Sequence, residues 1–185
     1  MIKSVLLLLL MPILVSGQIP TQEIVGKDTP GIAPAWLSLD DSTFSIQYPQ
    51  SWELNQEEAM GTRFILFSPA ESEDDAFREN VNLLLQDVSG LQLDLATYTE
   101  LSLDQLKIMF NAFHLIENQR LKKGKLEYQK LMYTAEQGMF QLQFEQYYWV
   151  IGDAAYVLTF TSEENKFADY METSEKILNS FSIRK

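Results

Sequence analysis

Apolar and polar residues follow a strand-like pattern in seven segments of the chain. In 44–48, Phe44, Ile46 and Tyr48 alternate with polar residues, and Pro49 then ends the pairing because proline has no N–H. The other segments are apolar at alternate positions or rich in aromatic and β-branched residues. They cover residues 62–68, 80–88, 114–121, 126–134, 140–150 and 154–161. The pattern therefore predicts about seven strands.

Two further segments carry apolar side chains at helical spacing. The first runs over about 95–111, with Asp94 in position to cap its N-terminus. The second stripe consists of Phe167, Tyr170, Ser174, Leu178 and Phe181, and Ser162 is the predicted cap. The sequence therefore predicts two helices.

The connections between the last four strand segments are short and contain glycine. They hold Gly124, Gly138 and the pair Gly152-Asp153, and short turns of this kind join antiparallel neighbours. Long runs of strands broken by only two helices are typical of the α+β class. We expect an antiparallel β-sheet of about seven strands flanked by helices.

The N-terminal part of the chain reads as a targeting segment followed by an arm. Residues 1–17 combine Lys3, an apolar run broken by Pro12 and small residues before Gln18, which predicts a cleaved signal peptide. The apolar run is about half the 20 residues that a bilayer-spanning helix needs, and no cysteine follows it for lipid attachment. We expect a secreted or periplasmic protein that is not a lipoprotein and has no transmembrane segment after cleavage. Residues 18–42, rich in proline and glycine, form a linker or N-terminal arm, and 43–185 a single domain.

Charge and cysteine content exclude several classes of function. The formal net charge is −12, and −13 without residues 1–17, which hold one lysine and no acid. Nucleic acid is therefore an unfavourable partner, because phosphate binding needs a strongly cationic surface. The chain has no cysteine, which excludes disulfides, thiolate nucleophiles and thiolate metal sites.

The sequence offers no recognisable catalytic motif. Its one histidine, His114, adjoins Phe113 and is expected to be a structural or surface residue. A Ser–Lys dyad or a carboxylate pair assembled from distant positions is compatible with the sequence. The acidic run 71–75 could coordinate a divalent cation, but it lacks the glycine turn and alternating acids of calcium loops. We therefore expect a solvated loop there, no cofactor and no enzymatic activity.

Two groups of residues are candidates for recognition. Tyr147 and Trp149 alternate with the predicted core residues of 140–150, and exposed aromatic residues are enriched at interfaces; the alternative is that a helix covers this face as well. The second group forms a basic cluster in a hairpin turn, which could contact an acidic partner or anionic lipid or could simply be solvated. It consists of Arg120, Lys122, Lys123 and Lys125.

The order and spacing of several short motifs resemble those of the PsbP-like family. They are Phe44-Ser45-Ile46-Gln47-Tyr48-Pro49 with Trp52, Phe67-Ser68-Pro69, Glu79-Asn80-Val81-Asn82 and Ile177-Leu178-Asn179-Ser180-Phe181-Ser182-Ile183. The resemblance covers about 43–183 and implies an antiparallel sheet between helices, an αβα sandwich. It implies no shared reaction, and it favours protein binding or an assembly role over catalysis. No local motif carries over a metal-contacting or docking residue from the photosystem II protein.

These observations lead to one functional hypothesis and two alternatives. We expect an exported, non-enzymatic accessory module that binds an unknown protein partner in the cell envelope. The alternatives are a small hydrolase that uses carboxylates in a cleft and a carrier of a lipid or small ligand. Buried carboxylates with raised pKa would favour the hydrolase, and an apolar cavity would favour the carrier.

Overall fold

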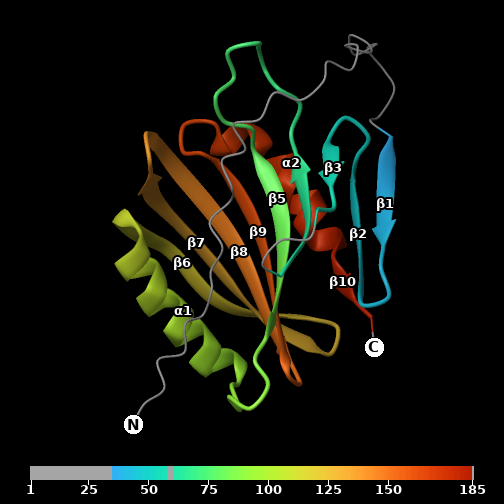
Figure 1. Ribbon diagram of the computed structural model, residues 1–185, viewed down its shortest axis with the longest axis vertical. Helices are drawn as coiled ribbons and strands as arrows, with labels where there is room; N and C mark the ends of the chain where they lie inside the picture. Colours follow the sequence, from blue (N-terminus) through green and yellow to red (C-terminus); the bar gives the residue numbers. More distant parts are fainter. Residues whose placement is uncertain (1–34, 58–60, 185) are drawn as a thin grey trace.

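The computed structural model describes residues 35–57 and 61–184. The predicted signal peptide, and the predicted arm as far as residue 34, lie outside the described residues. Within these ranges the chain forms two helices and ten strands (Figure 1). No helix in the described part is long and apolar enough to cross a membrane.

Seven strands form a central antiparallel sheet, as predicted for the fold class. Its spatial order is β3-β4-β5-β9-β8-β7-β6. The strands are β3 (Glu53–Asn55), β4 (Thr62–Phe67), β5 (Asn80–Asp87), β6 (Asn111–Lys123), β7 (Leu126–Gln137), β8 (Phe140–Ile151) and β9 (Ala154–Glu163). The short β3 at one edge has no counterpart among the predicted strands.

Glycine sets the three tight turns of this sheet. Gly124, Gly138 and Gly152 have φ angles of 63°, 62° and 58° and each begins a two-residue connection between adjacent strands. A positive φ at the first turn residue is required by the turns that match the twist of antiparallel strands, and glycine adopts it without steric cost. The predicted hairpins are confirmed.

A second, three-stranded sheet contains the segment that carries the first motif. It has the order β1-β2-β10, with β1 (Trp36–Asp40), β2 (Phe44–Pro49) and β10 (Ser182–Ile183). Phe44 and Ile46 are fully buried against the central sheet, so β2 lies over the face of that sheet instead of extending it. The sequence predicts that residues 36–40 belong to a linker or N-terminal arm. This prediction is wrong, because they form the edge strand of the second sheet.

The molecule has three layers, with the central sheet in the middle (Figure 1). Helix α1 (Leu95–Met109) covers one face of the central sheet and buries Tyr98, Leu103 and Leu106 on it. Helix α2 (Phe167–Ser180) and the small sheet cover the other face, where Phe167, Ile177 and Leu178 are buried. This is the expected αβα arrangement.

The starts of the two helices differ from each other. The Asp94 carboxylate accepts a hydrogen bond of 2.8 Å from the Thr97 N–H, so the predicted N-cap of α1 is confirmed. The predicted cap of α2 is wrong, because β9 continues to Glu163 and holds Ser162 in the sheet. Lys166 takes the N-cap position of α2 without a capping side-chain hydrogen bond.

Candidate functional site

Tyr147 and Trp149 do not form an exposed aromatic patch. Their exposed fractions are 5% and 4%, so the surface position considered for them is wrong. The Trp149 ring packs at centroid distances of 5.2 Å from Phe181 and 5.3 Å from Tyr128. The α2 layer covers this face of β8 as α1 covers the other, which is the alternative that the sequence left open. The apolar stripe of 167–181 was the sequence signal for this second cover.

Beside these rings lies a buried ionic group that the sequence reasoning missed. Glu145 is 1% exposed in its side chain and contacts the Lys130 ammonium at 3.1 Å, and Glu117 on β6 contacts the same ammonium at 3.3 Å. Burial lowers the pKa of Lys130, but the neighbouring Glu145 and Glu117 carboxylates outweigh this effect and the pKa is raised overall. The Tyr147 hydroxyl donates a hydrogen bond of 3.1 Å to Glu145. Each charged side chain of this group contacts one of opposite charge, as is typical of a structural ion pair.

The predicted basic cluster is divided between two faces of the β6–β7 hairpin. The Lys123 ammonium turns inward and donates hydrogen bonds to the carbonyl oxygens of Asn179 and, at 3.0 Å, of Phe181. It therefore satisfies carbonyls at the C-terminal end of α2, where a cation is favourable. Burial lowers the pKa of Lys123. Lys123 therefore caps the C-terminal end of α2, and we no longer count it among the recognition candidates.

The other three cations remain on the surface of the hairpin. Arg120 donates a hydrogen bond of 2.9 Å to the Gln129 side chain and lies 3.8 Å from Glu127, with both ionic groups well exposed. Lys122 and Lys125 are exposed and make no ion pair in the described part of the chain. We call Arg120, Lys122 and Lys125 the basic hairpin. It is what the structure leaves of the predicted cluster.

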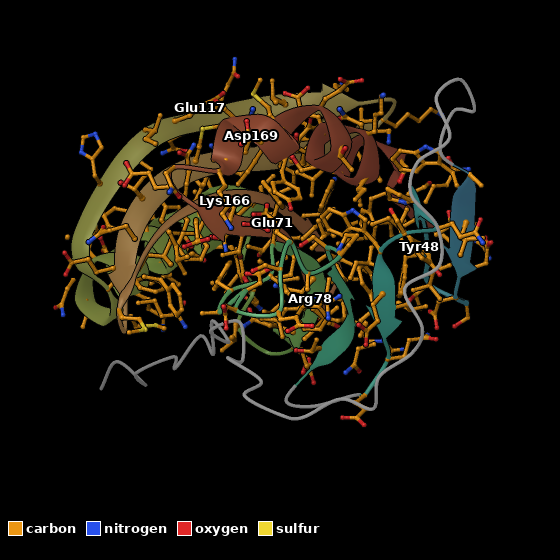
Figure 2. All side chains as sticks on the ribbon, turned by 90° about the horizontal axis from the view of Figure 1, so that it is seen from above. Tyr48, Glu71, Arg78, Glu117, Lys166 and Asp169 are labelled. Carbon is orange, nitrogen blue, oxygen red and sulfur yellow. The ribbon has the colours of Figure 1, made fainter. Side chains whose placement is uncertain are left out.

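A second ionic group lies at the start of α2. The Lys166 ammonium contacts Glu71 and Glu163 at 2.9 Å each, and the Tyr170 hydroxyl donates a 2.9 Å hydrogen bond to Glu71. Figure 2, seen from above, shows Lys166 and Glu71 next to each other at this end of the sandwich. Hydrogen bonds to Glu163 and Glu71 raise the pKa of Lys166. These contacts fasten the loop between β4 and β5 onto the first turn of α2.

Glu79 lies beneath this fastened loop. Its exposed fraction is 0%, and one carboxylate oxygen accepts a hydrogen bond of 3.2 Å from the Ser68 hydroxyl. The other oxygen, Oε1, has no hydrogen-bond partner among the described residues. Burial raises the pKa of Glu79, although the Lys166 charge and the Ser68 hydrogen bond act in the opposite direction. Among residues 35–57 and 61–184, Glu79 is the one group that matches the buried acid with a raised pKa expected for the hydrolase alternative.

The acidic run 71–75 is folded by its own hydrogen bonds. Asp75 accepts hydrogen bonds from the backbone N–H groups of Glu71 at 3.0 Å and Phe77 at 3.2 Å. Glu71 itself is held by Lys166 and Tyr170. Among residues 35–57 and 61–184, no group of three or more His, Asp or Glu side chains is arranged to hold a metal ion. The loop is thus held by Asp75 from within and by the contact of Glu71 with Lys166.

Comparison with solved structures supplies the fold relationship. The solution structure of cyanobacterial PsbP (CyanoP) from Synechocystis is similar with a TM-score of 0.63 and 12% identity, over 86% of this chain and 99% of that one. LpqN of Mycobacterium tuberculosis, described as involved in cell envelope biogenesis, is similar with a TM-score of 0.65 and 14% identity, over 82% and 91% of the two chains.

A third similar structure is PA94 from Pseudomonas aeruginosa, a protein of unknown function described as a putative regulator. Its TM-score is 0.60 at 14% identity, over 81% of this chain and 98% of that one. Neither a protein-family model nor a curated protein sequence matches the chain. The three-layer architecture and these structural matches together show that this chain has the PsbP-like fold.

Proposed function

We propose that this protein is an exported, non-enzymatic PsbP-like module that binds another protein in the cell envelope, and that the basic hairpin is its contact surface. The observation that carries the proposal is a local excess of positive charge, three cations beside the single ion-pair partner Glu127. Arg120, Lys122 and Lys125 lie together on one exposed hairpin of a chain whose formal net charge is −12. Electrostatic complementarity of this kind favours association with an acidic surface and sets orientation.

The envelope location rests on two further observations. The first is the signal-like sequence of residues 1–17. The second is the similarity of fold to LpqN, whose description places it in cell envelope biogenesis. Export is tested by determining the N-terminus of the protein in fractionated source cells. We expect a chain that begins near Gln18 in the periplasm or medium, and an intact Met1 in the cytosol would contradict export.

Partner binding is tested by crosslinked capture from the envelope fraction on immobilised protein comprising residues 18–185. We expect one protein to be recovered by the unmodified domain and lost from the variant Arg120→Gln/Lys122→Gln/Lys125→Gln. As a control, Lys107→Gln/Lys176→Gln removes two exposed lysines, one charge fewer than the hairpin variant, from the two helices. Equal recovery by the hairpin variant would refute the basic hairpin as the contact surface. Recovery of small molecules alone would favour a carrier.

One observation supports the hydrolase alternative. Glu79 is a buried carboxyl with a raised pKa, a property that general acids share. Its complete burial under the Lys166–Glu71 contact favours a structural role, because a general acid must reach the atom that it protonates. A panel of chromogenic ester, glycoside and phosphate substrates decides between the two. Turnover that disappears in Glu79→Gln would replace the binding proposal with catalysis.

A further inference from the structure

We propose that the outer edge of β6 is a strand-addition site, at which an extended segment with acidic residues at alternate positions joins the central sheet. This inference rests on the proposed protein-binding function and names the surface and the chemistry of the partner. β6 lies at one end of the strand order and pairs only with β7, so among the described strands none pairs with its other edge. The unpaired N–H and C=O groups of such an edge are a template for another strand.

The two edges of the central sheet are protected to different degrees. At one end β3 spans three residues, whereas β6 at the other end spans 13. Natural sheets limit association at their edges by short strands, by bulges and by charged side chains, lysine in particular. Exposed cations on β6 therefore oppose pairing with most strands, and acidic residues on a partner would offset them. β3 is protected because it is short. β6 has irregularities of register only in its first part, between Asn111 and His114 and between Leu115 and Glu117.

The second part of β6 is regular and open. From Glu117 to Lys123 every residue pairs in unbroken register with β7, from Met132 back to Leu126. Asn118, Gln119 and Arg120 are exposed in this stretch. A regular stretch of seven residues is longer than a typical strand of five to six. It is therefore long enough to hold an added strand.

The positive charge on residues 117–123 favours a partner with acidic residues. Within 117–123 the one acid, Glu117, is paired with Lys130 at 3.3 Å. On β7, Glu127 lies opposite Lys122 and 3.8 Å from Arg120. Three cations against Glu127 leave the hairpin with a positive excess. Arg120 and Lys122 lie two residues apart and therefore on the same face, and Lys125 follows in the turn. Residues directly opposite on an added strand would have Cβ atoms about 5 Å away. Two acidic residues separated by one position would thus face Arg120 and Lys122.

The other face of the same stretch suits uncharged residues between the acids. It carries Glu117 and Lys123, which are already bonded to Lys130 and to carbonyls at the end of α2. Between them lie Gln119 and Leu121, and Leu121 is half-buried and paired with Tyr128. An added strand places its intervening side chains beside these two residues. The segment that fits best alternates acidic and β-branched apolar residues.

Synthetic peptides provide the direct test. The probe is an eight-residue peptide that alternates glutamate and valine, labelled for fluorescence anisotropy and added to the domain at 50 mM salt. Two isomers carry backbone N-methyl groups on alternate residues, one set on the glutamates and the other on the valines. In an added strand only one set of N–H groups faces β6. We expect one isomer to lose binding at least tenfold and the other to bind like the unmethylated peptide.

Variants of the domain connect this binding to the charges on β6. Arg120→Glu/Lys122→Glu is expected to weaken peptide binding at least tenfold, and Lys107→Glu/Lys176→Glu, with the same change in net charge, by less than twofold. Hydrogen exchange of the folded domain gives a second measure, in which amides of 117–123 become protected when the peptide binds. Unchanged circular dichroism of each variant confirms that it folds.

Several outcomes would overturn strand addition. Equal binding of the two methylated isomers would mean an electrostatic contact without pairing, and no binding of any peptide would mean that the edge lysines act as a barrier to association. Self-association through β6 in sedimentation experiments would identify a second copy as the occupant. If the peptides fail while capture still depends on the basic hairpin, strand addition is wrong and the proposed function stands. If the peptides bind and capture fails, the proposed function is wrong.

Discussion

The two faces of the central sheet are covered in different ways. The first is covered by α1, which lies between β5 and β6 in the chain and packs over β6, β7 and β8, the three strands that follow it. The second is covered by α2 together with β1, β2 and β10, which come from both ends of the described chain (Figure 1). One cover is local in sequence and the other joins residues more than 130 positions apart, such as Ser180 and Gln47, whose backbone N–H donates to the serine hydroxyl.

The buried polar groups differ between the faces as well. Under α1 they are neutral: the Tyr148 hydroxyl donates to Gln146, whose amide donates to Thr159 at 3.1 Å. Under the second cover they include the carboxylates Glu145 and Glu79. Glu145 is paired there with Lys130, on the neighbouring strand β7 of the central sheet. The second face therefore contains both the aromatic residues that the sequence offered as recognition candidates and buried carboxylates that the sequence did not reveal.

The largest expected effect comes from removing the aromatic centre of the second face. Trp149→Ala should lower the free energy of unfolding by about 3–5 kcal/mol, because a buried indole is lost and a cavity remains. Phe144→Ala on the α1 face, also buried, is the matched control with a similar expected cost. Denaturant unfolding measures both. A cost below about 1 kcal/mol for Trp149→Ala alone would mean that the second cover is not part of the cooperative unit.

Removal of the buried cation should be nearly as costly. Lys130→Met leaves Glu145 buried without its ion-pair partner, so we expect a loss of about 3 kcal/mol, near the low end for a broken buried pair because Lys130 retains 16% exposure. The double variant Lys130→Met/Glu145→Gln should recover most of this loss. A double-mutant cycle by urea denaturation measures the coupling. Additive costs would show that the two residues do not interact.

Glu79 should make the stability of the second face depend on pH. The pKa of Glu79 is raised in the folded state, so the folded chain binds more protons than the unfolded chain above the ordinary glutamate pKa of 4.5. The contribution of Glu79 to stability is then present below that pH and decreases as pH rises through the folded pKa. Melting temperatures from pH 4 to 8 should show this decrease in the unmodified protein, and the difference from Glu79→Gln should shrink toward pH 4. A pH-independent difference would contradict the raised pKa.

The smallest effect concerns the end of α2. Lys123→Met removes the donor to the Asn179 and Phe181 carbonyls and should cost about 1 kcal/mol, as for a cation at a helix C-terminus. The neighbouring Lys125→Met should change stability by less than about 0.5 kcal/mol, because it is exposed and makes no ion pair in the described residues. Thermal unfolding compares the two. Equal losses of stability in Lys123→Met and Lys125→Met would mean that Lys123 does not stabilise the end of α2 and is again a candidate for recognition.

The fold class and most elements could be predicted because their signals are local. The α1 helix was predicted over 95–111 and is observed at Leu95–Met109, with Asp94 as its cap. The glycine turns predicted three of the antiparallel pairings. The prediction for Ser162 failed because a capping residue and a strand residue are not distinguished by local composition, and pairing with Gln143 holds Ser162 in β9.

The candidate sites were predicted less well, because exposure depends on distant residues. The alternation of β8 correctly separates its two faces, but it does not say whether the second face is covered. Phe181 and Tyr128 cover Trp149 from distant positions in the chain. In the same way, adjacent lysines appear as one cluster in the sequence. Both Lys122 and Lys123 are exposed, but strand geometry brings the Lys123 ammonium alone to the carbonyls at the end of α2.

Sequence alone determined the period of each element, the positions of the tight turns and the acidic character of the chain, because these depend on neighbouring residues and on composition. Only the tertiary structure decided which strands share a sheet, which face of β8 is closed and which charges are paired, because these depend on contacts between residues far apart in the chain. Burial turned Tyr147 and Trp149 from recognition candidates into core residues. The same tertiary arrangement left the regular edge of β6 and its basic hairpin open to a partner.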